Sequence, residues 1–251
     1  MSIQNSLTPY FSTELGKLYN CDFKELLKSL KDDSIDLVFT SPPYNMGVSN
    51  TYKEYKDNLS NEDYYFLLKT LIEESLRICN GLIFINLNYT NNNKKVLYRI
   101  LYEYCEYLRE SIIWDKGNCE PPAGNILGKR YEYVFMFTKN NKIEINNFRE
   151  NKAKNYQKVF GNWISNVVRL STKSDQTSYS KINRAGFPLE LPRVFIDIYT
   201  KSGDIILDPF MGVGTTAIVS ERMNRKWVGS DISKSCCITA KSLIGGIALQ
   251  I

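Results

Sequence analysis

The most informative part of the sequence is an apolar run that ends in a rigid loop, Ile35-Asp36-Leu37-Val38-Phe39-Thr40-Ser41-Pro42-Pro43-Tyr44. The apolar residues predict a buried strand. The two prolines stiffen the loop, because each fixes its own φ and restricts the residue before it. Ligands of open α/β sheets bind at such strand ends. Hydroxyl and carbonyl oxygens can accept hydrogen bonds from an NH₂ group and a phenol ring can stack on a base, so the loop predicts a pocket for an aromatic amine. Prolines also end strands that carry no site.

A second motif lies near the other end of the chain, where the apolar run 205–207 leads into Asp208-Pro209-Phe210-Met211-Gly212-Val213-Gly214-Thr215-Thr216. A helix and another strand are expected to follow, and that strand ends at Asp231. This order is half of a nucleotide-binding unit, in which the acidic residue can bond ribose hydroxyls. The sequence has neither a third glycine at the dinucleotide spacing nor a Gly-Lys-Ser/Thr phosphate loop. It therefore favours a nucleoside-type ligand such as S-adenosylmethionine over a pyrophosphate.

Together the two motifs resemble the amino-methyltransferases of DNA, which methylate the exocyclic amine of cytosine (N4) or adenine (N6). The catalytic loop precedes the cofactor loop, as in the β group of this family, whose two sheet halves are permuted. Protein-glutamine methyltransferases have a similar catalytic tetrad, but theirs begins with Asn and follows the cofactor loop. The resemblance covers nearly the whole chain, with matching segments at 17–22, 36–45, 111–116, 131–139, 187–192 and 208–216.

The resemblance implies a Rossmann-like α/β fold with a doubly wound, mostly parallel sheet, and S-adenosylmethionine as cofactor. The implied catalytic residues are Ser41, Pro42, Pro43 and Tyr44. The implied cofactor-binding residues are Asp22, Thr40, Asp208, Phe210, Gly212, Gly214, Thr215 and Asp231. Thr-Ser-Pro-Pro-Tyr, in place of Asp-Pro-Pro-Tyr, resembles the cytosine-N4 branch, and adenine N6 stays open as the alternative. One departure is Asn183, which stands where relatives often carry a His.

Basic charge is concentrated in residues 139–186, which contain ten Lys and Arg but three acidic residues. Such a segment is typical of phosphate binding, although a charge run alone is more often a solvated loop. The resemblance places a target-recognition region here, between the catalytic half at 1–138 and the cofactor-binding half at 187–251. The residues expected to contact DNA are Lys152, Lys154, Lys158, Arg169, Lys173, Lys181 and Arg184.

The composition is that of one α/β domain: 251 residues, 43% of them hydrophobic, with a net charge of +5. Six Cys without paired C-x-x-C spacing and the absence of His argue against a metal site. No signal peptide or long apolar run is visible, which predicts a cytoplasmic protein without a membrane segment. The implied partner is double-stranded DNA. Whether the protein is a homodimer, or has a cognate restriction endonuclease, stays open.

Alternating apolar runs predict a parallel, doubly wound sheet, with an antiparallel pair within 108–138. We expect a flexible flap at 45–60 and a mobile loop at 115–130, and we assign no function to the Asn-rich segment 91–95. The expected strands are 17–21, 35–40, 82–87, 108–114, 131–138, 204–207 and 226–230. The expected helices are 23–30, 61–79, 93–105, 189–200, 215–223 and 232–243.

The implied chemistry is direct methyl transfer to a base that has been flipped out of the duplex. Tyr44 would stack on the base, while the Ser41 hydroxyl and the Pro42 carbonyl accept hydrogen bonds from the amine. Asp231 would hold the cofactor ribose and Asp22 the adenine amine. We expect Ser41→Ala to lower turnover more than cofactor binding, and Asp231→Ala to do the reverse. A protein that keeps this fold but only binds nucleic acid is the alternative from another class.

Overall fold

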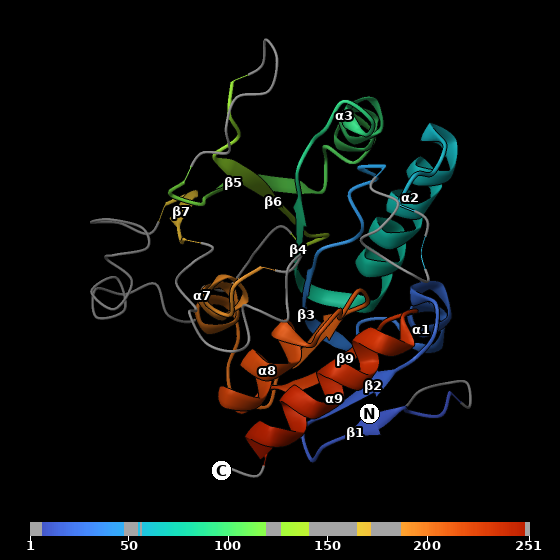
Figure 1. The fold of residues 1–251 in the computed structure, drawn as a ribbon, viewed down its shortest axis with the longest axis vertical. Coiled ribbons are helices and arrows are strands. Elements are labelled where there is room, and N and C mark those ends of the chain that lie inside the picture. Colours follow the sequence, from blue (N-terminus) through green and yellow to red (C-terminus); the bar gives the residue numbers. More distant parts are fainter. Residues whose placement is uncertain are drawn as a thin grey trace.

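The computed structural model describes residues 7–47, 55, 57–118, 127–140, 165–171 and 187–248, which form a single nine-stranded sheet with helices on both faces (Figure 1). The strand order is β1-β2-β9-β8-β3-β4-β6-β5-β7. The strands are β1 (Phe11–Ser12), β2 (Gly16–Tyr19), β3 (Ile35–Thr40), β4 (Cys79–Leu87), β5 (Leu108–Asp115), β6 (Tyr131–Phe137), β7 (Val167–Arg169), β8 (Ile205–Asp208) and β9 (Lys226–Ser230). The helices are α1 (Phe23–Ser29), α2 (Asn61–Ile78), α3 (Lys94–Glu103), α7 (Glu190–Tyr199), α8 (Thr215–Arg222) and α9 (Lys234–Ala248).

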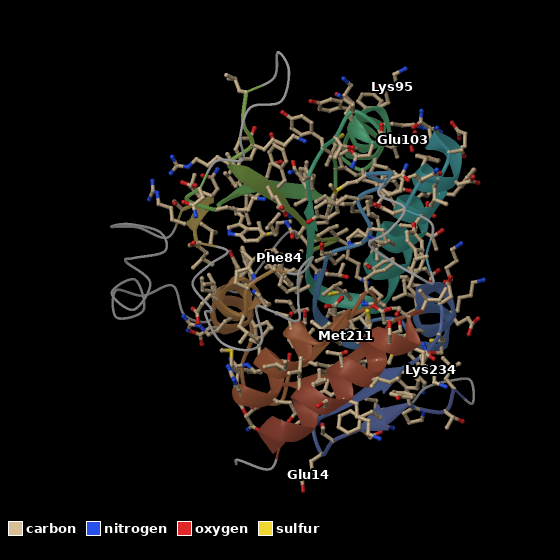
Figure 2. The ribbon with its side chains drawn as sticks, viewed as in Figure 1. Glu14, Phe84, Lys95, Glu103, Met211 and Lys234 are labelled. Carbon is tan, nitrogen blue, oxygen red and sulfur yellow. The ribbon has the colours of Figure 1, made fainter. Side chains whose placement is uncertain are left out.

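The helices divide between the two faces of the sheet. The apolar sides of α1, α2 and α3 form one buried cluster with the sheet, while α7, α8 and α9 bury theirs in two clusters on the other side. In Figure 1, β3 and β4 accordingly run between α2 and α7. Figure 2 shows Phe84 of β4 in the interior, whereas Lys95 and Lys234 lie at the surface. The Phe84 ring packs at a tilt against Phe195 of α7, with 4.6 Å between ring centroids. The expected doubly wound α/β fold is confirmed.

The two strands that precede the predicted motifs are neighbours. β3 pairs with β8 in parallel, with Leu37 opposite Ile206 and Val38 opposite Leu207. From this pair the chain turns in opposite directions, because β3 leads through α2 to β4 and β8 leads through α8 to β9. Such a reversal opens a crevice at the carboxyl edge, where ligands of open α/β sheets bind.

Most predicted elements are confirmed within a few residues, and the predicted antiparallel pair is β5 with β6. The prediction was short for β4, which begins at Cys79, and for α9, which continues to Ala248. Two short strands were not expected. β1 pairs antiparallel with β2, and β7 pairs parallel with β5. β7 therefore makes three residues of the predicted recognition region, 139–186, part of the central sheet.

Candidate active site

The carboxyl edge of the sheet collects the predicted cofactor and catalytic residues in one row. Asp22 follows β2 and Asp231 follows β9, while the glycine loop follows β8 and Ser41 follows β3. Because these four strands are consecutive in the sheet, their carboxyl ends meet side by side. Two motifs far apart in the sequence thus form one continuous site.

Asp208 joins the two halves of this site. Its buried carboxylate accepts hydrogen bonds from the Thr40 hydroxyl at 2.7 Å and the Thr216 hydroxyl at 2.6 Å. The main-chain N–H of Phe210 also donates to it, at 3.1 Å. Burial raises the pKa of Asp208 to about 6, although the two threonine hydroxyls act in the opposite direction. Asp208 therefore fixes the shape of the glycine loop that follows it, and ties that loop to Thr40 at the end of β3.

The glycine loop is closed by Asp231. The N–H of Gly212 donates to Asp231 Oδ2 at 2.8 Å, and the N–H of Ser233 donates to Oδ1 at 2.8 Å. Gly212 has φ +54°, and a Cβ there would meet no atom within 4 Å, so the loop borders open space. Gly214, at φ +93°, forms the N-cap of α8, and a side chain at either position would be strained.

This part of the edge fits a nucleoside-type cofactor. A carboxylate has room for about four hydrogen bonds, and the main-chain N–H groups of Gly212 and Ser233 donate two to Asp231. Asp22 caps α1 by accepting from the N–H of Lys24 at 2.8 Å, and it is only partly buried. The ring of Phe210 packs on Phe23 at 4.7 Å between centroids. Thr215, also predicted to bind the cofactor, is buried as the first residue of α8.

The Ser-Pro-Pro-Tyr loop is held through its main chain. Tyr64 Oη donates to the carbonyl of Pro43 at 2.9 Å, and Asn93 Nδ2 donates to the carbonyl of Tyr44 at 2.6 Å. Among the described residues, the carbonyl of Pro42 has no hydrogen-bond partner. The loop is thus anchored at the two residues that follow the Pro42 carbonyl.

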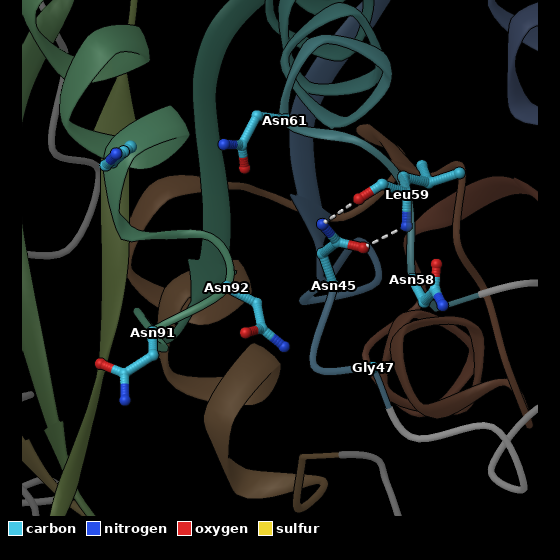
Figure 3. Close-up of a pocket in the computed structure, with 8 residues that line it drawn as sticks. Asn45, Gly47, Asn58, Leu59, Asn61, Asn91 and Asn92 are labelled. Carbon is cyan, nitrogen blue, oxygen red and sulfur yellow. Dashed lines mark hydrogen bonds between the residues drawn. The ribbon is translucent and has the colours of Figure 1, made fainter.

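The residues after Tyr44 are anchored as firmly. Asp57, which is buried, accepts from the N–H of Asn45 at 2.8 Å and from the N–H of Met46 at 3.0 Å. The Asn45 side chain exchanges two hydrogen bonds with the main chain of Leu59, at 3.0 and 2.6 Å (Figure 3). Asn45 has φ +55°, a left-handed conformation that Asn tolerates better than most residues. The loop is therefore a preformed structure in the described part of the chain.

The Tyr44 hydroxyl lies in a polar cluster behind the loop. It donates towards Glu132 Oε2 at 2.9 Å and Asn86 Oδ1 at 3.0 Å, and Ser41 Oγ donates to it at 3.2 Å. Lys116 forms an ion pair with Glu132 at 3.0 Å. Burial and the neighbouring Glu132 carboxylate raise the pKa of Tyr44 well above its ordinary value. The phenol therefore stays protonated and acts as a hydrogen-bond donor.

The sequence matches the family model for DNA methylases over residues 35–242. The chain belongs to the N6/N4 DNA methylase family. It is 31% identical to the type II methyltransferase M.BamHI of Bacillus amyloliquefaciens, over 92% of this chain and 57% of that protein. This methylase chain thus spans little more than half the length of that relative.

Solved structures share the fold of this methylase. The PvuII DNA methyltransferase (cytosine-N4-specific) superposes with a TM-score of 0.73 at 21% identity, over 98% of this chain and 95% of that one. The M1.HpyAVI–SAM complex superposes with a TM-score of 0.61 at 20% identity, over 92% of this chain and 100% of that one. The predicted resemblance and the methyltransferase fold are confirmed.

Beside the Ser-Pro-Pro-Tyr loop is an open hollow of about 400 Å³. Amide side chains dominate its lining, and among the described residues the lining includes a lysine but no carboxylate (Figure 3). The lining residues are Asn45, Gly47, Asn58, Leu59, Asn61, Asn91, Asn92 and Lys95.

The predicted DNA contacts are represented in the described residues by Arg169 alone. It is exposed at the end of β7, on the same edge as Ser41. The expected contacts that lie outside the described residues are Lys152, Lys154, Lys158, Lys173, Lys181 and Arg184. Half of the predicted flap at 45–60 and half of the loop at 115–130 lie outside them too.

Sequence reasoning missed the residues that hold the loop: Asp57, Asn93, Asn86 and Glu132. Asn93 stands in a run to which no function was assigned. Asn86 gave a usable signal, because it is polar at the carboxyl end of an apolar strand next to β3. Within the described residues, no group of three potential metal ligands occurs and no helix is long and apolar enough to cross a bilayer.

Proposed function

We propose that this chain transfers a methyl group from S-adenosylmethionine to the N4 amine of cytosine in duplex DNA. The observation that carries the proposal is the meeting of two loops on adjacent strands. One loop carries the Ser41 hydroxyl and the unpartnered Pro42 carbonyl, and the other carries Gly212 against Asp231. Further support comes from the solved relative named as cytosine-N4-specific and from the relative crystallised with SAM.

Catalysis would rest on positioning. When bound, S-adenosylmethionine supplies a methyl group on a positively charged sulfur. Ser41 Oγ and the Pro42 carbonyl would accept hydrogen bonds from the two amine hydrogens, which turns the nitrogen lone pair toward the methyl carbon. The anchors on Pro43 and Tyr44 keep these acceptors in place, and preorganisation of this kind can supply roughly 7–11 kcal/mol.

DNA would lie across the carboxyl edge. Cytosine in a duplex is stacked and paired, so it must be flipped out to reach Ser41. The amide-lined hollow beside the loop and the exposed Arg169 flank the proposed position of the base and suit contacts with bases and phosphates. We extend this surface to the basic segment 139–186 as the region that recognises the target sequence.

Incubation with unmethylated DNA and S-adenosylmethionine, followed by nucleoside mass spectrometry, tests the proposal. N4-methylcytosine supports it. N6-methyladenine would replace cytosine by adenine as the substrate, the alternative that the family allows. If DNA of varied sequence gains no methyl group although the protein binds it, the chain is a nucleic-acid-binding protein and the proposal is wrong.

The roles of the two loops can be separated by mutation. Ser41→Ala removes an acceptor for the amine and is expected to lower the single-turnover rate with little change in the Kd for S-adenosylmethionine. Asp231→Ala removes the carboxylate that closes the glycine loop and is expected to raise that Kd most. Equal losses of cofactor binding in the two variants would contradict this division.

A further inference from the structure

We propose that Glu132 is a positioning residue that sets the direction of a hydrogen-bond chain ending at Ser41. The inference rests on the proposed methyl transfer, in which Ser41 must present lone pairs, and not its hydrogen, to the target amine. The proposed function gives no part in this reaction to Glu132 or to its ion-pair partner Lys116. Glu132 comes from β6 and Lys116 follows β5, so neither belongs to the two sequence motifs.

The chain consists of contacts within hydrogen-bond distance. Ser41 Oγ lies 3.2 Å from Tyr44 Oη, which lies 2.9 Å from Glu132 Oε2. Asn86 Oδ1 is a second acceptor for Tyr44, at 3.0 Å. The other oxygen of Glu132 is 3.0 Å from the amine of Lys116, and both side chains are nearly buried, at 13% and 14% exposure.

The chemistry of these groups fixes which way the hydrogens point. An ionised carboxylate only accepts hydrogen bonds. The Asn86 amide nitrogen donates to the carbonyl of Tyr133 at 3.0 Å and to Glu132 at 3.2 Å, which leaves its oxygen facing Tyr44. Tyr44 thus meets two acceptors and must turn its hydrogen toward them.

The direction in which the Tyr44 hydroxyl hydrogen points then determines the direction of the Ser41 hydroxyl hydrogen. With its own hydrogen committed, Tyr44 Oη can only accept from Ser41, and the Ser41 hydrogen points away from the base. The Ser41 lone pairs remain for an amine hydrogen. A reversed chain would aim the Ser41 hydrogen at the amine nitrogen, where it would compete for the lone pair that attacks the methyl carbon. No proton moves along the chain in this proposal.

Glu132→Gln is expected to reverse the chain with almost no change in shape. The Lys116 amine can donate only, so it would hold the amide oxygen of the new side chain. The amide NH₂ would then face Tyr44 and Asn86, where the carboxylate oxygen had been an acceptor. The Asn86 amide donates to this carboxylate oxygen in the wild type, so it would turn over, give up its bond to the Tyr133 carbonyl and accept from the new NH₂ through its oxygen. Tyr44 would then meet donors from both side chains, and its hydrogen would turn toward Ser41.

The test measures single-turnover methyl transfer at saturating DNA and cofactor, together with the Kd for S-adenosylmethionine. For Glu132→Gln we expect a rate about tenfold lower, the loss of roughly one hydrogen bond, with an unchanged Kd. In the Tyr44→Phe background the chain is already broken, so Glu132→Gln should have little further effect. An equal effect of Glu132→Gln in both backgrounds would show that Glu132 acts by another route and would overturn the inference.

A second substitution, at Lys116, distinguishes an effect on the direction of the hydrogen bonds from a loss of structural support by the Lys116–Glu132 ion pair. Adding Lys116→Met to Glu132→Gln frees the amide to rotate, so that its oxygen again accepts from Tyr44 and Asn86, and the rate should recover severalfold. If the ion pair only supported the fold, the rate would not recover. A rate that fails to recover would therefore count against the inference. Thermal unfolding checks that each variant folds.

A second measurement needs neither cofactor nor DNA. The relative intensity of the two bands of the tyrosine Raman doublet differs between a phenol that donates a hydrogen bond and one that accepts it. The difference between wild type and Tyr44→Phe should show a donor, and the corresponding difference in the Glu132→Gln background should show an acceptor. An unchanged doublet would overturn the inference while leaving the proposed function intact. If the wild-type protein methylates no DNA, the proposed function fails and this inference fails with it.

Discussion

The side-chain amide of Asn93 donates to the main-chain carbonyl of Tyr44 at 2.6 Å and to the carbonyl of Asn88 at 3.0 Å. Its oxygen accepts from the N–H of Thr90 at 2.6 Å. Asn93 is buried and is the N-cap residue of α3, yet its side chain does not cap that helix. One amide thus joins the turn after β4 to the Ser-Pro-Pro-Tyr loop.

Replacing Asn93 by Ala should therefore loosen the loop. The Tyr44 carbonyl and the Thr90 N–H would lose their partner in a part-buried place, which costs up to about 1–3 kcal/mol for each group left unsatisfied. We expect a lower unfolding midpoint in urea and at least a tenfold slower single turnover. Asn80→Ala, at an exposed position on the opposite edge of the sheet, is the matched control and should change neither. A normal rate in Asn93→Ala would mean that the loop does not depend on this anchor.

Asp208 gives the fold a pH dependence of predictable sign. Its pKa rises from 3.8 to about 6 on burial, so the folded state binds the proton more tightly than the unfolded state. The resulting stabilisation is complete below about pH 3.8 and is lost as the pH rises through about 6. Relative to Asp208→Asn, which does not titrate, the wild type should lose about 2 kcal/mol of unfolding free energy between about pH 4.5 and about pH 7.5. Urea unfolding of both proteins at the two pH values measures the difference, and parallel curves would refute it.

Gly229 allows β9 to pass close to the glycine loop. A Cβ there would lie 1.9 Å from Met211 Cε and 2.8 Å from the carbonyl of Asp208. Gly229→Ala should therefore displace the loop, raise the Kd for S-adenosylmethionine and destabilise the fold by about 1–3 kcal/mol. Gly246→Ala in α9, where a Cβ meets nothing within 4 Å, should be neutral or slightly stabilising. Calorimetric titration and thermal unfolding of the two variants make the comparison, and equal behaviour would show that the loop has room.

Arg169 is expected to contact a DNA phosphate. Arg169→Ala should weaken binding to DNA of any sequence and reduce the slope of log K against log salt by about 1. Lys28→Ala is the control, because Lys28 is exposed in the last turn of α1, at the opposite edge of the sheet. Fluorescence anisotropy over a range of salt concentrations gives both slopes. An unchanged slope for Arg169→Ala would place the DNA away from β7.

The central strands could be predicted from sequence because their apolar runs are bounded by turn residues. β1 and β7 could not, since they have two and three residues and owe their conformation to the strands beside them. β7 also lies in a segment whose basic charge directed attention to DNA. Local sequence does not encode a pairing whose partner, β5, lies more than 50 residues earlier.

The candidate site also contains residues that could be predicted from sequence and residues that could not. Ser41 and Asp231 were predictable, because each belongs to a motif with its own local signal. Asp57, Asn93 and Glu132 were not, because they reach the loop from three different segments and become neighbours only in the folded sheet. Asp208 was expected to bind the cofactor, a role that remains a prediction. The hydrogen bonds that it makes in the structure go to Thr40, Thr216 and Phe210.

The hydrogen bond between Thr40 and Asp208 spans 168 positions of the chain, and this has a consequence for synthesis on the ribosome. β3 leaves the ribosome long before its neighbour β8 exists, so in the nascent chain this central strand can pair with β4 on one side only until residues beyond 208 emerge. Contacts this distant slow folding, because the entropy of closing the loop is lost before any pairing compensates for it. The sheet should therefore be completed late and all at once, when the residues from β8 onward fold against strands already made.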